Sequence, residues 1–103
     1  MTYGLRFLPE VEEDVINGYS WYEEKSRGLG EDFLRMFYAA ANELSGNPLF
    51  YQKVHQDFRR KLLRRFPYAI YFALENDLVI VFGLFHCARN PQFVLTKLQD
   101  RGR

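Results

Sequence analysis

The residues with the clearest chemical potential are five cations within the nine-residue stretch 58–66, namely Arg59, Arg60, Lys61, Arg64 and Arg65. Alternate side chains of an extended strand share a face, so Arg60 and Arg64 are expected on one side and Arg59, Lys61 and Arg65 on the other. Because neither face is purely apolar, the pattern predicts a strand near a sheet edge or one that extends beyond its covering helices. Such a row of cations fits nucleic-acid phosphates or an acidic partner peptide. Cations on an edge strand also prevent sheet-to-sheet aggregation.

A second group of polar residues follows the most apolar run of the chain. His86 continues the alternation of that run and is expected to be a hydrogen-bonded core residue rather than a catalytic base. Arg89 suits either a phosphate or a structural carboxylate or carbonyl partner. Cys87 is interpreted as a small buried apolar residue, since a reactive thiolate needs a nearby base. His55 has no obvious companions and is interpreted as a surface residue.

The sequence offers no motif for a cofactor or a metal. It contains no P-loop, dinucleotide fingerprint or serine elbow. One cysteine cannot form an internal disulfide, and with two histidines it cannot complete a zinc site. We therefore expect no cofactor and no metal.

Length and composition predict a single domain over residues 1–103. Apolar residues make up 48% and aromatic residues 17%, enough to close a small core. The longest uncharged stretches, 66–74 and 78–88, fall well short of the roughly 20 residues that a membrane-spanning helix needs. The first residues lack the layout of a secretory signal, so we expect a soluble cytoplasmic protein without membrane contact.

Charge is divided unevenly along the chain. Residues 1–50 carry four cations against nine acids, a net charge of −5, and residues 51–103 carry ten cations against four acids, a net charge of +6. The two halves therefore have different partners, or they complement each other within the fold.

The first half predicts a strand and a helical hairpin. Leu5–Leu8 is a short apolar strand, and the acidic turn after Pro9 begins a helix over about 10–26. Gly18 inside this helix suggests the close approach of a neighbour. After a turn at 26–30, a second helix carries one apolar stripe and ends at Gly46-Asn47-Pro48. The stripe consists of Phe33, Met36, Phe37, Ala40, Ala41 and Leu44.

The second half predicts a sheet. Residues 49–57 are irregular, and strands are expected at 58–66, 68–74 and 78–85, with a hairpin turn at 75–77. The tail from Gln92 is short and mostly polar. The expected fold is α+β: an N-terminal strand, an antiparallel two-helix hairpin, then a three-stranded antiparallel sheet completing a mainly antiparallel sheet whose one face the hairpin covers.

Three sequence pieces together resemble one family. They are the Arg-rich strand that passes through Phe66-Pro67-Tyr68 into the next strand, the run Val79-Ile80-Val81, and the exit His86-Cys87-Ala88-Arg89-Asn90-Pro91. In this combination the chain resembles the ParE/RelE superfamily, toxins of type II toxin–antitoxin (plasmid stabilisation) systems. The resemblance extends over nearly the whole chain.

The resemblance implies a small toxin that a cognate antitoxin protein holds inactive by wrapping around the hairpin and the sheet. It leaves two targets open. ParE-like toxins inhibit DNA gyrase and are not nucleases, whereas RelE-like toxins cut mRNA on the ribosome. A relative that has lost activity and only binds antitoxin is a third possibility.

Proton-transfer chemistry favours the ParE-like branch. Metal-independent RNA cleavage needs a base, an acid and cations for the phosphorane. Arg59, Arg60, Arg64 and Arg89 are candidate cations and His86 the candidate base of such a ribonuclease. The resemblance implies that a RelE-like ribonuclease often takes its proton-transfer group from a tyrosine or histidine in the tail. Here no tyrosine follows Tyr71 and no histidine follows His86. We therefore expect no catalytic residues, and assign gyrase or antitoxin binding to Ile16, Trp21, Arg59, Arg60, Arg64, Arg65 and Arg89.

Overall fold

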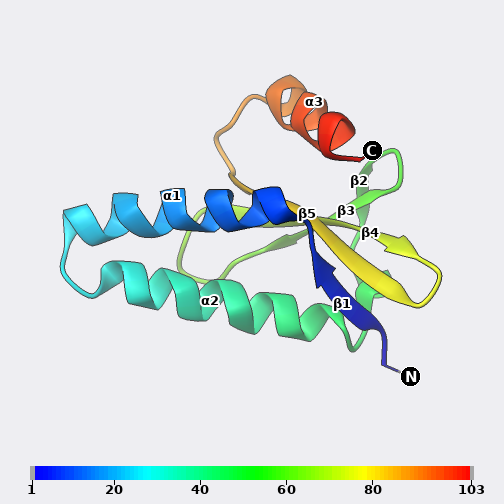
Figure 1. Cartoon of the computed structure of the whole chain (residues 1–103), viewed down its shortest axis with the longest axis horizontal. Helices are drawn as coiled ribbons and strands as arrows, with labels where there is room; N and C mark the ends of the chain where they lie inside the picture. Colours follow the sequence, from blue (N-terminus) through cyan, green and yellow to red (C-terminus); the bar gives the residue numbers. More distant parts are fainter. Residues whose placement is uncertain (1, 103) are drawn as a thin grey trace.

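A five-stranded sheet organises the computed structural model, which describes residues 2–102 (Figure 1). The order across the sheet is β1-β5-β4-β3-β2; β1 runs parallel to β5 and every other pairing is antiparallel. The elements in chain order are β1 (Gly4–Phe7), α1 (Pro9–Lys25), α2 (Leu29–Leu44), the short 3₁₀ turn η1 (Pro48–Phe50), β2 (Lys53–His55), β3 (Phe58–Leu62), β4 (Tyr68–Glu75), β5 (Leu78–His86) and α3 (Pro91–Arg101). This is the predicted α+β class with its mainly antiparallel sheet.

The helical hairpin of α1 and α2 covers one face of the sheet, as predicted (Figure 1). Its turn is closed by Glu23, whose carboxylate accepts hydrogen bonds from the backbone N–H groups of Gly28 and Gly30. Gly28 adopts a φ of +89°, a conformation that glycine tolerates. Gly18 allows the close approach that its position suggested, because a Cβ there would lie 2.5 Å from the Phe33 ring of α2.

Two apolar clusters lie on opposite faces of the sheet. The larger joins α1 and α2 to residues such as Ile70, Phe72 and Val79. The smaller joins Phe58 and Phe85 to α3. We call the two sides the hairpin face and the α3 face of the sheet.

A β-bulge in β5 changes which face its later residues occupy. Tyr71 pairs with Gly83 and Phe72 with Val81, so Phe82 has no partner in the register. Before the bulge, Val79 and Val81 pack on the hairpin face; after it, Leu84 does. Simple alternation from Leu78 placed His86 on the same face as Leu78 and Ile80. This was wrong, because a bulge shifts the alternation by one residue.

The structure corrects three expectations for the second half of the chain. Residues 49–57 contain η1 and β2, a three-residue edge strand. The strand predicted at 58–66 ends at Leu62, since Arg65 has a positive φ of 71° and the Leu63 N–H closes the loop onto the Tyr68 carbonyl. The tail forms helix α3, capped by the Asn90 side chain, which accepts from the Gln92 N–H at 2.7 Å.

Candidate functional site

The basic strand β3 divides its cations between the two faces of the sheet, as strand alternation predicts. Arg59 and Lys61 lie on the hairpin face, where both contact Tyr51. The Arg59 guanidinium donates to the Tyr51 carbonyl at 2.6 Å, and the Lys61 ammonium donates to the Tyr51 hydroxyl at 2.7 Å. Both cations therefore hold η1 and its neighbouring loop against the sheet.

Lys61 also forms an ion pair with Glu43 of α2, with Nζ 2.9 Å from Oε1. Burial works to lower the pKa of Lys61, but its hydrogen bonds to Tyr51 and Glu43 outweigh burial and raise that pKa above the usual 10.5. The same hydrogen bond and charge from Lys61 lower the pKa of Glu43 below 4.5. The pair is thus fully charged near neutral pH and joins the sheet to the hairpin.

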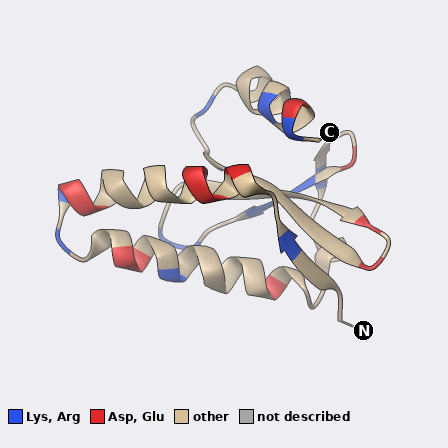
Figure 2. Ribbon diagram, viewed as in Figure 1, with Lys and Arg blue, Asp and Glu red and all other residues tan. Residues whose placement is uncertain are grey.

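The two arginines of the loop after β3 point toward α2. Arg65 lies 3.5 Å from the Asp32 carboxylate, and Arg64, whose side chain is 83% exposed, lies 4.0 Å from that of Glu43. The acidic first half of the chain therefore neutralises part of the basic second half. Figure 2 shows the acids along α1 and α2 and the basic residues on β3, the loop after it and α3.

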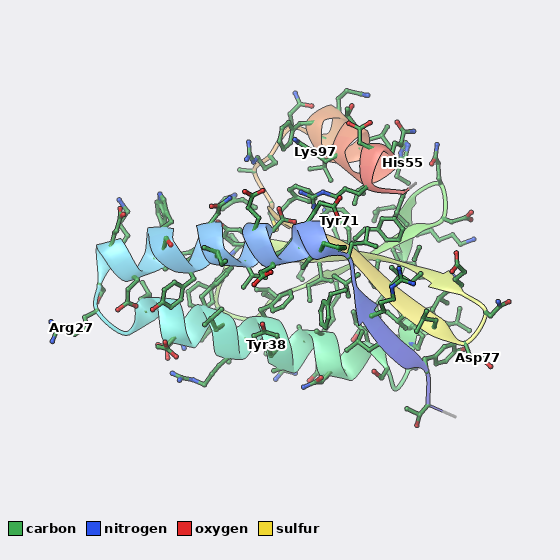
Figure 3. The ribbon with its side chains drawn as sticks, in the orientation of Figure 1. Arg27, Tyr38, His55, Tyr71, Asp77 and Lys97 are labelled. Atoms are coloured by element: carbon green, nitrogen blue, oxygen red, sulfur yellow. The ribbon has the colours of Figure 1, made fainter. Side chains whose placement is uncertain are left out.

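Arg60 is the β3 cation that faces the α3 side. With Arg89 it lines a cavity of about 290 Å³ between the β2–β3 edge and the start of α3. His55, Tyr71 and Cys87 line the same cavity, and Figure 3 labels His55 and Tyr71 on this side of the molecule. The structure thus brings His55 to the same cavity as two arginines, which sequence reasoning did not predict. Cys87 is exposed, so its interpretation as a buried residue was wrong: it follows the end of β5, where the chain has left the core.

A larger cavity, of about 530 Å³, lies between α1 and α3 over the end of β5. Trp21, His86 and Arg89 line it together with residues of α3. His86 is half-buried rather than a core residue, and its ring stacks edge-on against Tyr68 with centroids 5.2 Å apart.

Hydrogen bonding fixes the tautomer of His86. Its Nδ1 accepts from the Ala88 N–H at 3.0 Å, so Nε2 carries the proton of the neutral ring. Burial raises the pKa of the neighbouring Tyr68 hydroxyl, although the Arg89 charge opposes that shift. In this tautomer the Nδ1 lone pair of His86 is already used by the Ala88 N–H, and its Nε2–H is a donor toward the cavity.

The third surface is an apolar groove of about 470 Å³ along α1, α2 and the end of β1. Ile16 lines it beside Phe7 and Tyr38, and all three side chains are exposed. Tyr38 is labelled on α2 in Figure 3. Ile16 and Trp21 were both predicted to bind gyrase or the antitoxin, and they line different hollows along α1.

A fourth surface combines apolar and basic residues beside the free part of β3. Phe50 is 75% exposed, and it lines a hollow of about 520 Å³ with Val54, Arg60 and Leu62. The register pairs β2 with Phe58 and Arg59, and the Arg60 N–H donates to the Gln52 carbonyl at 3.3 Å. Within residues 2–102, the part of β3 that lies beyond this pairing is therefore its end at Lys61 and Leu62. We call this the β3-edge surface.

Neither a family model nor a curated protein matches the sequence. Solved structures do match the fold. A chain of the chromosomal ParDE toxin–antitoxin system from P. aeruginosa superposes with a TM-score of 0.71 at 13% identity, covering 82% of this chain and 96% of that one. A chain of the toxin–antitoxin complex RelBE2 from Mycobacterium tuberculosis gives 0.58 at 16% identity, over 86% and 95%.

A mutant of the E. coli toxin RelE in the free state gives a TM-score of 0.59 at 14% identity, covering 98% of both chains. The chain therefore has the fold of the ParE/RelE toxin superfamily. Within residues 2–102, no helix has the length and apolar character to cross a membrane.

Proposed function

We propose that this protein is the toxin of a type II toxin–antitoxin system and that a cognate antitoxin neutralises it. The support is the fold, which it shares with chains of two such systems and with RelE over 82–98% of its length. The chain also presents two surfaces suited to a wrapping partner, one apolar and one mixed. A second protein that covers them would remove exposed apolar side chains from water.

We further propose that the toxin is ParE-like: it inhibits DNA gyrase by binding it and performs no chemistry. The observation that carries this proposal is the dispersal of the basic residues. Arg59 and Lys61 hold Tyr51, while Arg64 and Arg65 lie beside acids of α2, so these four cations do not converge on one phosphate. The Nδ1 atom of His86 is occupied by the Ala88 N–H. The TM-score with the ParDE chain is also higher than those with the two Rel chains.

We propose that the antitoxin binds two surfaces: the apolar groove lined by Ile16, between α1 and α2, and the β3-edge surface. An apolar helix face fits the groove beside Phe7 and Tyr38. An extended acidic segment fits the β3-edge surface, where Arg60 supplies charge and Leu62 an apolar anchor. Among residues 2–102, no carboxylate lines that hollow to repel the segment.

Expression in a bacterial host tests the toxin assignment. Induction of this chain alone should arrest growth, and co-expression of the small protein encoded beside it should restore growth. If the chain forms a stable complex with that protein but never slows growth, it is an inactive antitoxin-binding relative. Normal growth without any complex would contradict the proposal as a whole.

A ribosome-dependent, metal-independent ribonuclease is the second candidate. One observation favours it: Arg60, His55 and Arg89 line a single cavity on the α3 face. Arginines there would stabilise a phosphorane, and an imidazole would move a proton. Under this hypothesis, expression cuts transcripts, and His55→Ala abolishes the cutting while the protein stays folded.

A further inference from the structure

The cavity between α1 and α3 is built from two matching helical stripes. Glu13, Asn17 and Trp21 recur every four residues along α1 and form one wall, and Phe93, Lys97 and Arg101 recur every four residues along α3 and form the other. Residues spaced in this way share one helix face. The end of β5, with Leu84 and His86, forms the floor. The volume of about 530 Å³ is in the range of small-molecule sites.

Two of the positive charges in this cavity lie beside the aromatic ring of Phe93. The Arg89 guanidinium lies 4.3 Å from the Phe93 ring centroid and the Lys97 ammonium 5.5 Å from it. Within residues 2–102, neither cation forms an ion pair, whereas Arg101 at the far end is already paired with Asp14. Two cations held on one aromatic ring make a site for an anion such as phosphate. The Nε2–H of His86 adds a further donor to the same lining.

The opposite wall offers a surface for an aromatic ring. Trp21 is 53% exposed although it lines the cavity. The Lys25 ammonium lies 4.6 Å from the centroid of its indole, so a base would stack on the side of the ring that Lys25 does not cover. Glu13 and Asn17, on the same stripe, provide an acceptor and an amide for the polar edge of a heterocycle. Stacking on an aromatic side chain, together with cations for the phosphate, is the usual means of binding a single nucleotide unit.

We propose that this cavity binds a nucleotide, with the base against Trp21 and the phosphate between Arg89 and Lys97. A phosphate alone would leave the Trp21 wall unused. An acidic peptide would meet the Glu13 carboxylate on that wall. The site does not depend on the toxin function, and the ligand is either a free nucleotide or the phosphorylated end of a strand.

Fluorescence of Trp21, the single tryptophan of the chain, tests the proposal directly. The protein is titrated with adenosine and guanosine 5′-monophosphates, with the nucleosides, with inorganic phosphate and with a 5′-phosphorylated trinucleotide. We expect saturable quenching by a mononucleotide, with nucleoside and phosphate each binding about tenfold or more weakly. Tighter binding of the trinucleotide assigns the site to a strand end, and equal affinity assigns it to a free nucleotide.

Variants then locate the phosphate. Arg89→Gln and Lys97→Gln should each weaken mononucleotide binding about tenfold, the loss of one charge-assisted contact. Arg6→Gln, an exposed cation on the distant strand β1, is the matched control and should leave affinity unchanged. The proposal is overturned if no mononucleotide quenches Trp21 saturably, if phosphate alone binds as well as the nucleotide, or if the two cavity variants bind like the control. Saturable quenching by a glutamate-rich peptide, without any by nucleotides, would also overturn it.

Discussion

Arg101, near the end of the chain, lies with its Nη1 atom 2.6 Å from the Oδ2 atom of Asp14 on the first helix. The contact is bidentate, since Nη2 lies 3.0 Å from Oδ1, and both side chains are about nine-tenths buried. Asp14 also accepts from the Leu84 N–H, and Arg101 donates to the Phe82 carbonyl. One ion pair thus joins α1, the β5 bulge and α3.

Removing either half of this pair should strongly destabilise the fold. Asp14→Asn leaves the Arg101 charge buried without its partner, and we expect a loss of about 3–5 kcal/mol in the free energy of unfolding. Urea denaturation measures it. Asp100→Asn, an exposed acid on the same helix as Arg101, is the control and should change little. Combining Asp14→Asn with Arg101→Leu should cost clearly less than the two single losses added together; strict additivity would contradict the coupling.

Gly18→Ala should destabilise the protein although alanine is the better helix former. The added methyl group would lie 2.5 Å from the Phe33 ring, which is fully buried between α1, α2 and the sheet. Overpacking of this kind costs about 1–3 kcal/mol. Thermal or urea unfolding measures the change. Gly46→Ala, whose Cβ would have ordinary contact with the Glu43 carbonyl at 3.6 Å, should be nearly neutral.

The Lys61–Glu43 pair predicts a pH dependence of stability. The pKa of Glu43 is lowered in the folded state, so its contribution is present above 4.5 and is lost as the pH falls through the lowered value. The pKa of Lys61 is raised, so its contribution is present below 10.5 and is lost as the pH rises through the raised value. Glu43→Gln should therefore be less stable than the natural chain at neutral pH, and the difference should shrink toward acid pH. In a Lys61→Met background, Glu43→Gln should have little effect on stability at either neutral or acid pH.

Charge reversal at Arg60 should weaken the proposed antitoxin complex. Arg60→Glu places a carboxylate in the β3-edge surface, and we expect affinity to fall about tenfold or more and to depend less on salt. Titration calorimetry at several salt concentrations measures both effects. Arg6→Glu on β1 makes the same change in net charge elsewhere and is the control. An affinity that responds equally to both variants would mean that net charge, and not this surface, attracts the antitoxin.

Much of the fold follows from periodicity that is visible in the sequence. The stripe from Phe33 to Leu44 and the acidic start of α1 are strong local signals, and the hairpin was predicted from them. Helix α3 was missed because Asn90-Pro91 was interpreted as the end of a strand. The same pair caps a helix whose buried residues, Val94 and Leu98, are four apart.

The site was less predictable because it depends on tertiary contacts. The β5 bulge, which places His86 in a cavity, arises from pairing with β4 and leaves no clear trace in the order of residues. The early end of β3 separated Arg64 and Arg65 from the strand. Arg101 and Asp14 are 87 positions apart, so no local pattern could join them.

A gyrase supercoiling assay with purified protein, run beside an mRNA cleavage assay with ribosomes, tests the central claim most directly. We predict that the protein inhibits supercoiling, that the antitoxin reverses the inhibition, and that transcripts stay intact. Normal supercoiling together with cut transcripts would contradict a gyrase-binding toxin.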